Sequence, residues 1–168
     1  MENYTQTEFD ALISCPKQVT EPPRQDMRLE RGHLRNDLKL GSDDDKVFTV
    51  FIRINEKFQE NFSIGLTYHP IDEPRSICLL RCNGRHGEHI NSPEAEPIPH
   101  FGYHVHVAQA DMLNMGQLPE RFAELTTEYA SYEEALVYFI RRVNLLEAHK
   151  YFNNLPQLLP LFDQRGEA

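Results

Sequence analysis

The chain has few cysteines, no long apolar run and no excess of basic residues. Its three cysteines, Cys15, Cys78 and Cys82, are odd in number and unevenly spaced, which speaks against a disulfide framework and is typical of a reducing compartment. No stretch approaches the ~20 uninterrupted apolar residues that a membrane span needs, and the first ten residues lack the layout of a signal peptide. We therefore expect a cytoplasmic protein with no membrane partner.

The charge is acidic, with 17 basic and 26 acidic residues and a formal net charge of -9. This balance works against general binding to nucleic acid, because attraction to phosphate is the main non-specific term in such binding. Any contact with RNA or a nucleotide would have to be local. The most basic segment spans 24–39, in which Arg31 and Arg35 are candidates to bind an anion, while a solvated strand edge is the alternative interpretation.

The 168 residues fall in the commonest range for a single domain, and we expect residues 1–168 to form one. Strand patterns come first and helix patterns follow, which is the order of an α+β fold. The sequence predicts a meandering antiparallel sheet of about five strands, with an N-terminal helix and C-terminal helices packed on one face.

Alternating apolar and polar residues mark the expected strands, and turn residues separate them. These strands cover 27–40, 47–54, 62–68, 76–82 and 101–108.

The short N-terminal helix is expected to begin with Thr7 as its cap and to end before Pro16. A weak helix is predicted over 119–129, and a strong one begins at Ser131, which forms a capping box with Glu134. The apolar tail from 155 to 162, broken by two prolines, is expected to pack as a strap or to dock a partner.

Histidines gather between the last two expected strands. Five of the eight histidines fall within 21 positions, namely His86, His89, His100, His104 and His106. A period of two places His104 and His106 on one face of their strand. In the preceding strand Ile77, Leu79 and Arg81 share a face, so Arg81 could point toward the same surface, depending on the strand register.

Three interpretations of this cluster remain open. Two histidines could act as general base and acid on a phosphodiester, with an arginine stabilising the phosphate charge. Alternatively, a transition metal such as zinc could bind to histidine ligands, with Cys82 as a further ligand. In the third interpretation the imidazoles only hydrogen-bond a long loop to the sheet. The candidate metal ligands are His86, His89, His104 and His106.

The run from Arg81 to His86, followed by Pro99-His100 and by His104-Val105-His106, resembles the histidine signature of the small TumE-like toxins of bacterial and archaeal toxin–antitoxin pairs. The resemblance covers about residues 62–108. It implies a compact α+β toxin that is neutralised by an antitoxin and acts on RNA or nucleotides. The positions that the motif match would give a role are Arg81, Asn83, His86, His104 and His106, together with His89 and His100.

The leading hypothesis is therefore a toxin-like, metal-independent ribonuclease without a cofactor. In it His86, His104 and His106 supply the acid–base chemistry, while Arg81 and Asn83 hold phosphate. The main alternative is a non-enzymatic interaction module, either antitoxin-like or a phage or host binding protein. A histidine-ligated metalloprotein is the third possibility.

Overall fold

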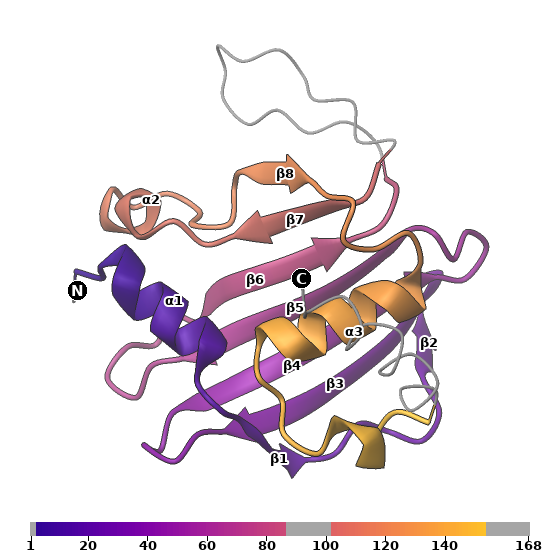
Figure 1. Cartoon of the computed structure of the whole chain (residues 1–168), viewed down its shortest axis with the longest axis horizontal. Coiled ribbons are helices and arrows are strands. Elements are labelled where there is room, and N and C mark those ends of the chain that lie inside the picture. The colour runs from indigo at the N-terminus through magenta and orange to yellow at the C-terminus, as the bar shows by residue number, and fades with distance from the viewer. Residues whose placement is uncertain (1–2, 87–101, 154–168) are drawn as a thin grey trace, which may run out of the picture.

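Alternating apolar and polar residues build the central sheet of the computed structural model, which describes residues 3–86 and 102–153. The sheet has eight strands, and all of its pairings are antiparallel. Its order is β1-β3-β4-β5-β6-β7-β8, and β2 also pairs with β3 (Figure 1). The strands are β1 (Gln18–Glu21), β2 (Arg28–Glu30), β3 (His33–Gly41), β4 (Val47–Asn55), β5 (Phe62–His69), β6 (Ile77–Asn83), β7 (His104–Val107) and β8 (Ala123–Leu125).

The predicted α+β class and antiparallel meander are confirmed, but the sheet has more strands than expected. The segment predicted as one strand over 27–40 is a hairpin of β2 and β3. It turns at Arg31 and Gly32, which both have positive φ angles of 50° and 76°. A two-residue turn keeps an alternating sequence pattern going while the chain reverses, so periodicity alone could not locate it. The helix predicted over 119–129 is wrong, because this segment contains β8, which pairs with β7.

Helices α1 (Gln6–Ser14) and α3 (Tyr132–Arg142) lie over the same face of the sheet, as Figure 1 shows. Helix α1 begins two residues earlier than predicted, since Thr5 and Glu8 form its capping box and Thr7 is already helical. Ser131 caps α3 as expected by accepting a hydrogen bond from the Glu134 backbone, but the Glu134 side chain accepts from the Ala130 backbone, so the predicted capping box is only half formed. The chain also has a short helix α2 (Ala110–Asn114) and a 3₁₀ helix η1 (Ala148–Lys150). No helix of the described residues is long and apolar enough to cross a membrane.

The two faces of the sheet differ in composition. On the covered face, alternate residues of β3, β4 and β5 such as Leu38, Val50 and Ile64 are buried against the helices. The opposite face, here called the open face, carries polar residues in register across the strands. Its members include His33, Arg35, Asp37 and Lys39 of β3, Thr49, Phe51 and Arg53 of β4, Ser63 and Gly65 of β5, Arg81 and Asn83 of β6, and His104 and His106 of β7.

Lys17 connects the C-terminal ends of α1 and α3 through hydrogen bonds. Its side chain is fully buried, and Nζ donates hydrogen bonds to the carbonyl oxygens of Ile13, Cys15 and Val143 at 2.8, 2.8 and 3.1 Å. The ammonium group also lies 4.8 Å from the centre of the Phe48 ring. Burial lowers the pKa of Lys17, while the carbonyl oxygens at two helix ends stabilise its charge. This buried cation fixes both helices on the covered face.

Candidate functional site

The register of β6 and β7 brings the predicted site residues together. Arg81 lies directly opposite His106, and Asn83 lies opposite His104. Both pairs point to the open face, because Tyr103, Val105 and Val107 take the covered side of the chain. The expected convergence of Arg81 with His104 and His106 is confirmed.

A β-bulge sets the direction of Arg81. Leu80 pairs with Leu66 and Cys78 pairs with Thr67, so Leu79 is an extra residue in β6. The prediction that Ile77, Leu79 and Arg81 share one face is therefore wrong, since the bulge shifts the alternation by one residue. Arg81 instead shares the open face with Asn83. Leu79 is fully buried, and its carbonyl oxygen accepts a hydrogen bond from the Ala108 backbone at 2.8 Å.

Gly84 lets the chain after β6 pass unusually close to the turn before β5. A Cβ atom at this position would lie 1.8 Å from the Glu60 carbonyl oxygen and 2.7 Å from the Phe62 ring. The Gly84 and Arg85 amides donate to the carbonyl oxygens of Phe62 and Glu60 at 3.0 and 2.8 Å. Only glycine permits this approach, which directs the following His86 back toward the sheet.

Three imidazole rings consequently form a row at this end of the open face. The His86 and His104 ring centres are 4.8 Å apart, and those of His104 and His106 are 5.3 Å apart. Neighbouring rings are tilted by 66° and 68° to each other. His104 and His106 are fully buried, whereas His86 is half-buried and forms the outer end of the row.

Hydrogen bonds fix the ring of His104. Its Nδ1 donates to the Gly102 carbonyl oxygen at 3.2 Å, which leaves Nε2 as the acceptor in the neutral ring. Nε2 lies 3.1 Å from the amide nitrogen of Asn83, and the amide oxygen of Asn83 accepts from the Ser63 hydroxyl at 2.8 Å. The buried Tyr129 hydroxyl contacts the backbone oxygens of His104 and Asn83 at 2.7 and 3.1 Å. His104 is thus a rigidly held residue.

His106 and Arg81 form the inner part of the site. His106 Nδ1 donates to the Glu120 carbonyl oxygen at 2.9 Å, which makes Nε2 the basic nitrogen of a neutral ring. The neighbouring guanidinium of Arg81 has a buried Nε that finds no hydrogen-bond partner among the described residues. A buried donor of this kind is costly to leave unpaired, and it is suited to an anion.

The metal interpretation loses Cys82 as a ligand. Cys82 pairs with Ile64 and Val105 on the covered face, so its thiol points away from His104. Burial raises the pKa of Cys82 to about 12, which disfavours the thiolate that a metal requires. Within residues 3–86 and 102–153, no three His, Cys, Asp or Glu side chains form a cluster that could hold a metal ion. The candidate ligand His89, like His100, lies outside the described residues, as does the apolar tail.

The two arginines predicted to bind an anion lie at the other end of the open face. Arg35 is half-exposed on β3 and pairs with Arg53 of β4. Arg31 lies in the turn between β2 and β3. The partner of Arg35, Arg53, lies in the same cross-sheet row as Ser63, Asn83 and His104.

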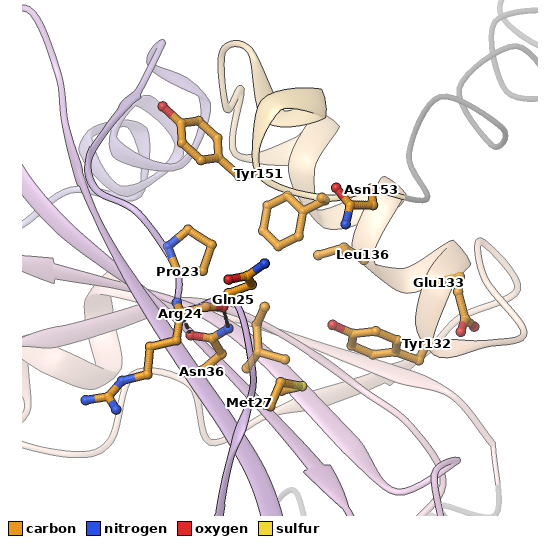
Figure 2. Close-up of a pocket in the computed structure, with 12 residues that line it drawn as sticks. Pro23, Arg24, Gln25, Met27, Asn36, Tyr132, Glu133, Leu136, Tyr151 and Asn153 are labelled. Carbon is orange, nitrogen blue, oxygen red and sulfur yellow. Dashed lines mark hydrogen bonds between the residues drawn. The ribbon is translucent and has the colours of Figure 1, made fainter.

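A further cavity of about 300 Å³, here called the strand–helix pocket, lies between the segment before β2 and helix α3. Figure 2 shows Gln25, Met27, Leu136 and Asn153 around this space. Asn36, an amide in an otherwise apolar row of β3, holds the segment by hydrogen bonds to the Arg24 backbone nitrogen and oxygen, both at 2.9 Å. This pocket could not be predicted from the sequence, because its lining comes from separate parts of the chain.

No protein-family model, curated protein or solved structure matches the chain. The resemblance to TumE-like toxins stays a prediction.

Proposed function

We propose that this protein is a toxin-like, metal-independent enzyme that cleaves RNA by acid–base chemistry at the histidine row. The observation that carries the proposal is the row itself, in which the ring of the half-buried His86 contacts the ring of the buried His104 edge to face, with 4.8 Å between the ring centres. Histidine is the side chain best suited to proton transfer near neutral pH. Three of them in line, next to an arginine, support a site for chemistry on a phosphodiester.

The three histidines take different roles in this proposal. His86 is the catalytic residue, because it is the most exposed ring of the row and can reach a polymer. His104 is a positioning residue, held by Asn83 and by the Gly102 carbonyl oxygen, and it orients His86 through their ring contact. His106 lies next to His104 at the inner end of the row, directly opposite Arg81.

The proposed reaction is an internal transesterification of RNA. His86 takes the proton of a ribose 2′-hydroxyl, whose oxygen attacks the adjacent phosphorus. The bond from phosphorus to the 5′-oxygen breaks, and that oxygen takes up a proton from water. Arg81, which lies opposite His106 at the inner end of the row, contributes the positive charge that stabilises the developing negative charge on the phosphate, and its buried Nε has no hydrogen-bond partner among the described residues. The products are a 2′,3′-cyclic phosphate and a 5′-hydroxyl.

The test is the cleavage of a labelled single-stranded RNA by the purified chain in excess chelator. We expect His86→Ala to lower the rate by about 100-fold or more, the lower limit for loss of a general base. His149→Ala is the matched control, since this exposed histidine lies on η1, far along the chain from the row. A DNA strand of the same sequence should stay intact, because it lacks the attacking hydroxyl.

Burial of His104 and His106 favours a second candidate, a non-enzymatic interaction module. Both rings donate Nδ1 to backbone carbonyl oxygens, as structural histidines do. Strand β8 ends the sheet, and its Leu125 is 57% exposed, so this edge offers a place for a partner such as an antitoxin. This candidate predicts that RNA stays uncut by the wild-type chain, while His104→Ala lowers its thermal stability.

A further inference from the structure

The open face carries a second polar site at its β2–β4 end, separate from the histidine row. A hollow of about 240 Å³, here called the arginine pocket, opens there. It is smaller than pockets that enclose whole drug-sized ligands, so it suits a single chemical group. Its lining residues are Arg24, Arg28, Glu30, Arg35, Asn36, Asp37 and Arg53.

The β2–β3 turn assembles this pocket. It places Arg28 directly opposite Arg35, and Arg35 is in turn opposite Arg53. Three arginines therefore stand side by side on adjacent strands, an arrangement in which like charges repel unless anions lie between them.

Protein carboxylates balance these charges only in part. Glu30 is 2.7 Å from Arg28 but 3.8 Å from Arg35, and Asp37 is 2.8 Å from Arg53. The Nε of Arg35 is buried and has no hydrogen-bond partner in the part of the chain that the structure describes. Arg35 thus has a hydrogen-bond donor that residues 3–86 and 102–153 leave available.

Arg24 adds a fourth guanidinium from outside the sheet. Asn36 clamps its backbone with two hydrogen bonds of 2.9 Å, which fixes the origin of the side chain. Arg24 lines both pockets, and in Figure 2 its guanidinium end points away from the strand–helix pocket. No ion pair of Arg24 occurs among the described residues.

Four arginines and two carboxylates line the pocket, which leaves an excess of two positive charges on a chain whose net charge is -9. We propose that the arginine pocket binds a phosphate group, of which a phosphomonoester dianion is the best match to this excess. Guanidinium groups match phosphate geometry because each can donate two parallel hydrogen bonds. The site goes beyond the proposed RNA cleavage and does not depend on it.

Calorimetric titration of the full chain with inorganic phosphate, at constant ionic strength, tests this proposal. We expect saturable binding to the wild type and at least a tenfold weaker affinity for Arg35→Gln. Arg24→Gln should also weaken binding, and this residue lies outside the strands, so its loss leaves the sheet pairing intact. Arg121→Gln, an exposed arginine far from the pocket, is the matched control and should bind as the wild type does.

The source of the phosphate is identified by comparing the affinities of two further ligands. One is a mononucleotide with a phosphomonoester, and the other is a dinucleotide whose two nucleosides are joined by one phosphodiester. Tighter binding of the mononucleotide through its monoester would indicate a small phosphorylated ligand, and tighter binding of the dinucleotide would indicate a polymer backbone. Absence of phosphate binding, or equal affinity in all four proteins, overturns the proposal and leaves the arginines as a solvated strand edge. His86→Ala should retain phosphate binding, so failure of the RNA hypothesis would be seen separately.

Discussion

The histidine end and the arginine end of the open face contain residues of one cross-sheet row, yet they differ in burial. Asn83 and His104 are buried, and each of their side chains is hydrogen-bonded to a neighbour. Arg35 and Arg53, in register with them, keep 35% and 28% of their side chains exposed. The position of a residue in a strand therefore determines only which face of the sheet its side chain lies on. Whether that side chain is buried in a structural network or accessible to a ligand depends on the other segments that cover it.

The largest expected effect on stability comes from substituting Gly84, where the chain passes close to Glu60 and Phe62 at the histidine end of the open face. Gly84→Ala should destabilise the fold by about 3 kcal/mol, because the new Cβ meets a backbone oxygen that cannot move aside. Urea unfolding measures this loss. Gly102→Ala is the control, since its Cβ would lie 3.2 Å from a terminal methyl of Leu125 and should cost less than about 1 kcal/mol. Equal losses in both variants would show that the close approach at Gly84 does not hold this end together.

Asn83→Ala should have the next largest effect. It removes the group that joins Ser63 to His104 and leaves a buried ring nitrogen without this contact, at a cost of about 2 kcal/mol. Ser63→Ala, which removes only the outer hydroxyl, is the control and should cost about half as much. Chemical denaturation of both variants gives the comparison, and an unchanged stability of Asn83→Ala would mean that the buried row is not a structural network.

Arg53→Met tests the arginine end in the same row. Its ion pair with Asp37 is open to solvent, and its guanidinium also donates to the carbonyl oxygens of Asn36 and Ile52 at 3.1 and 2.8 Å, so we expect a loss of about 1 kcal/mol. Phosphate affinity should fall in the same variant, because the guanidinium lines the arginine pocket. Unfolding and titration are measured on one preparation. A stability loss as large as that of Asn83→Ala would erase the distinction between the two ends.

The smallest expected effect concerns pH and His69, at the far end of β5. Burial, together with the nearby Lys39, lowers the pKa of His69 below its ordinary value of 6.5. The unfolded chain therefore takes up this proton first as the pH falls below 6.5, so the folded state loses stability until the pH passes the lowered pKa. His69→Gln should remove this slope in denaturation measured between pH 7 and pH 5. A slope that persists unchanged in the variant would assign it to other groups.

The sequence pattern predicted the parts of the fold that depend on one strand at a time. Alternation in β5 was sufficient to find its buried face, the β-branched and aromatic residues of 47–54 marked β4, and Ser131 marked the start of α3. The alternation could not reveal the chain reversal at Arg31 or the β-bulge at Leu79, because both depend on how a strand pairs with its neighbour.

The same limit applied to the site. The composition of 86–106 pointed to the histidines, and their alternation correctly placed His104 and His106 on one face. Their complete burial could not be predicted, since the covering residues come from other segments, such as Glu120. The arginine pocket was missed in part because Arg24, Arg28 and Arg53 meet only after the β2–β3 turn is formed.

The rate of RNA cleavage by the untagged wild-type chain and by His86→Ala, both in excess chelator, tests the central claim most directly. We predict a 2′,3′-cyclic phosphate product from the wild type and a rate lower by about 100-fold or more in the variant. Intact RNA with the wild type, or equal cleavage by both proteins, would contradict the proposed catalytic role of the histidine row and favour an interaction module.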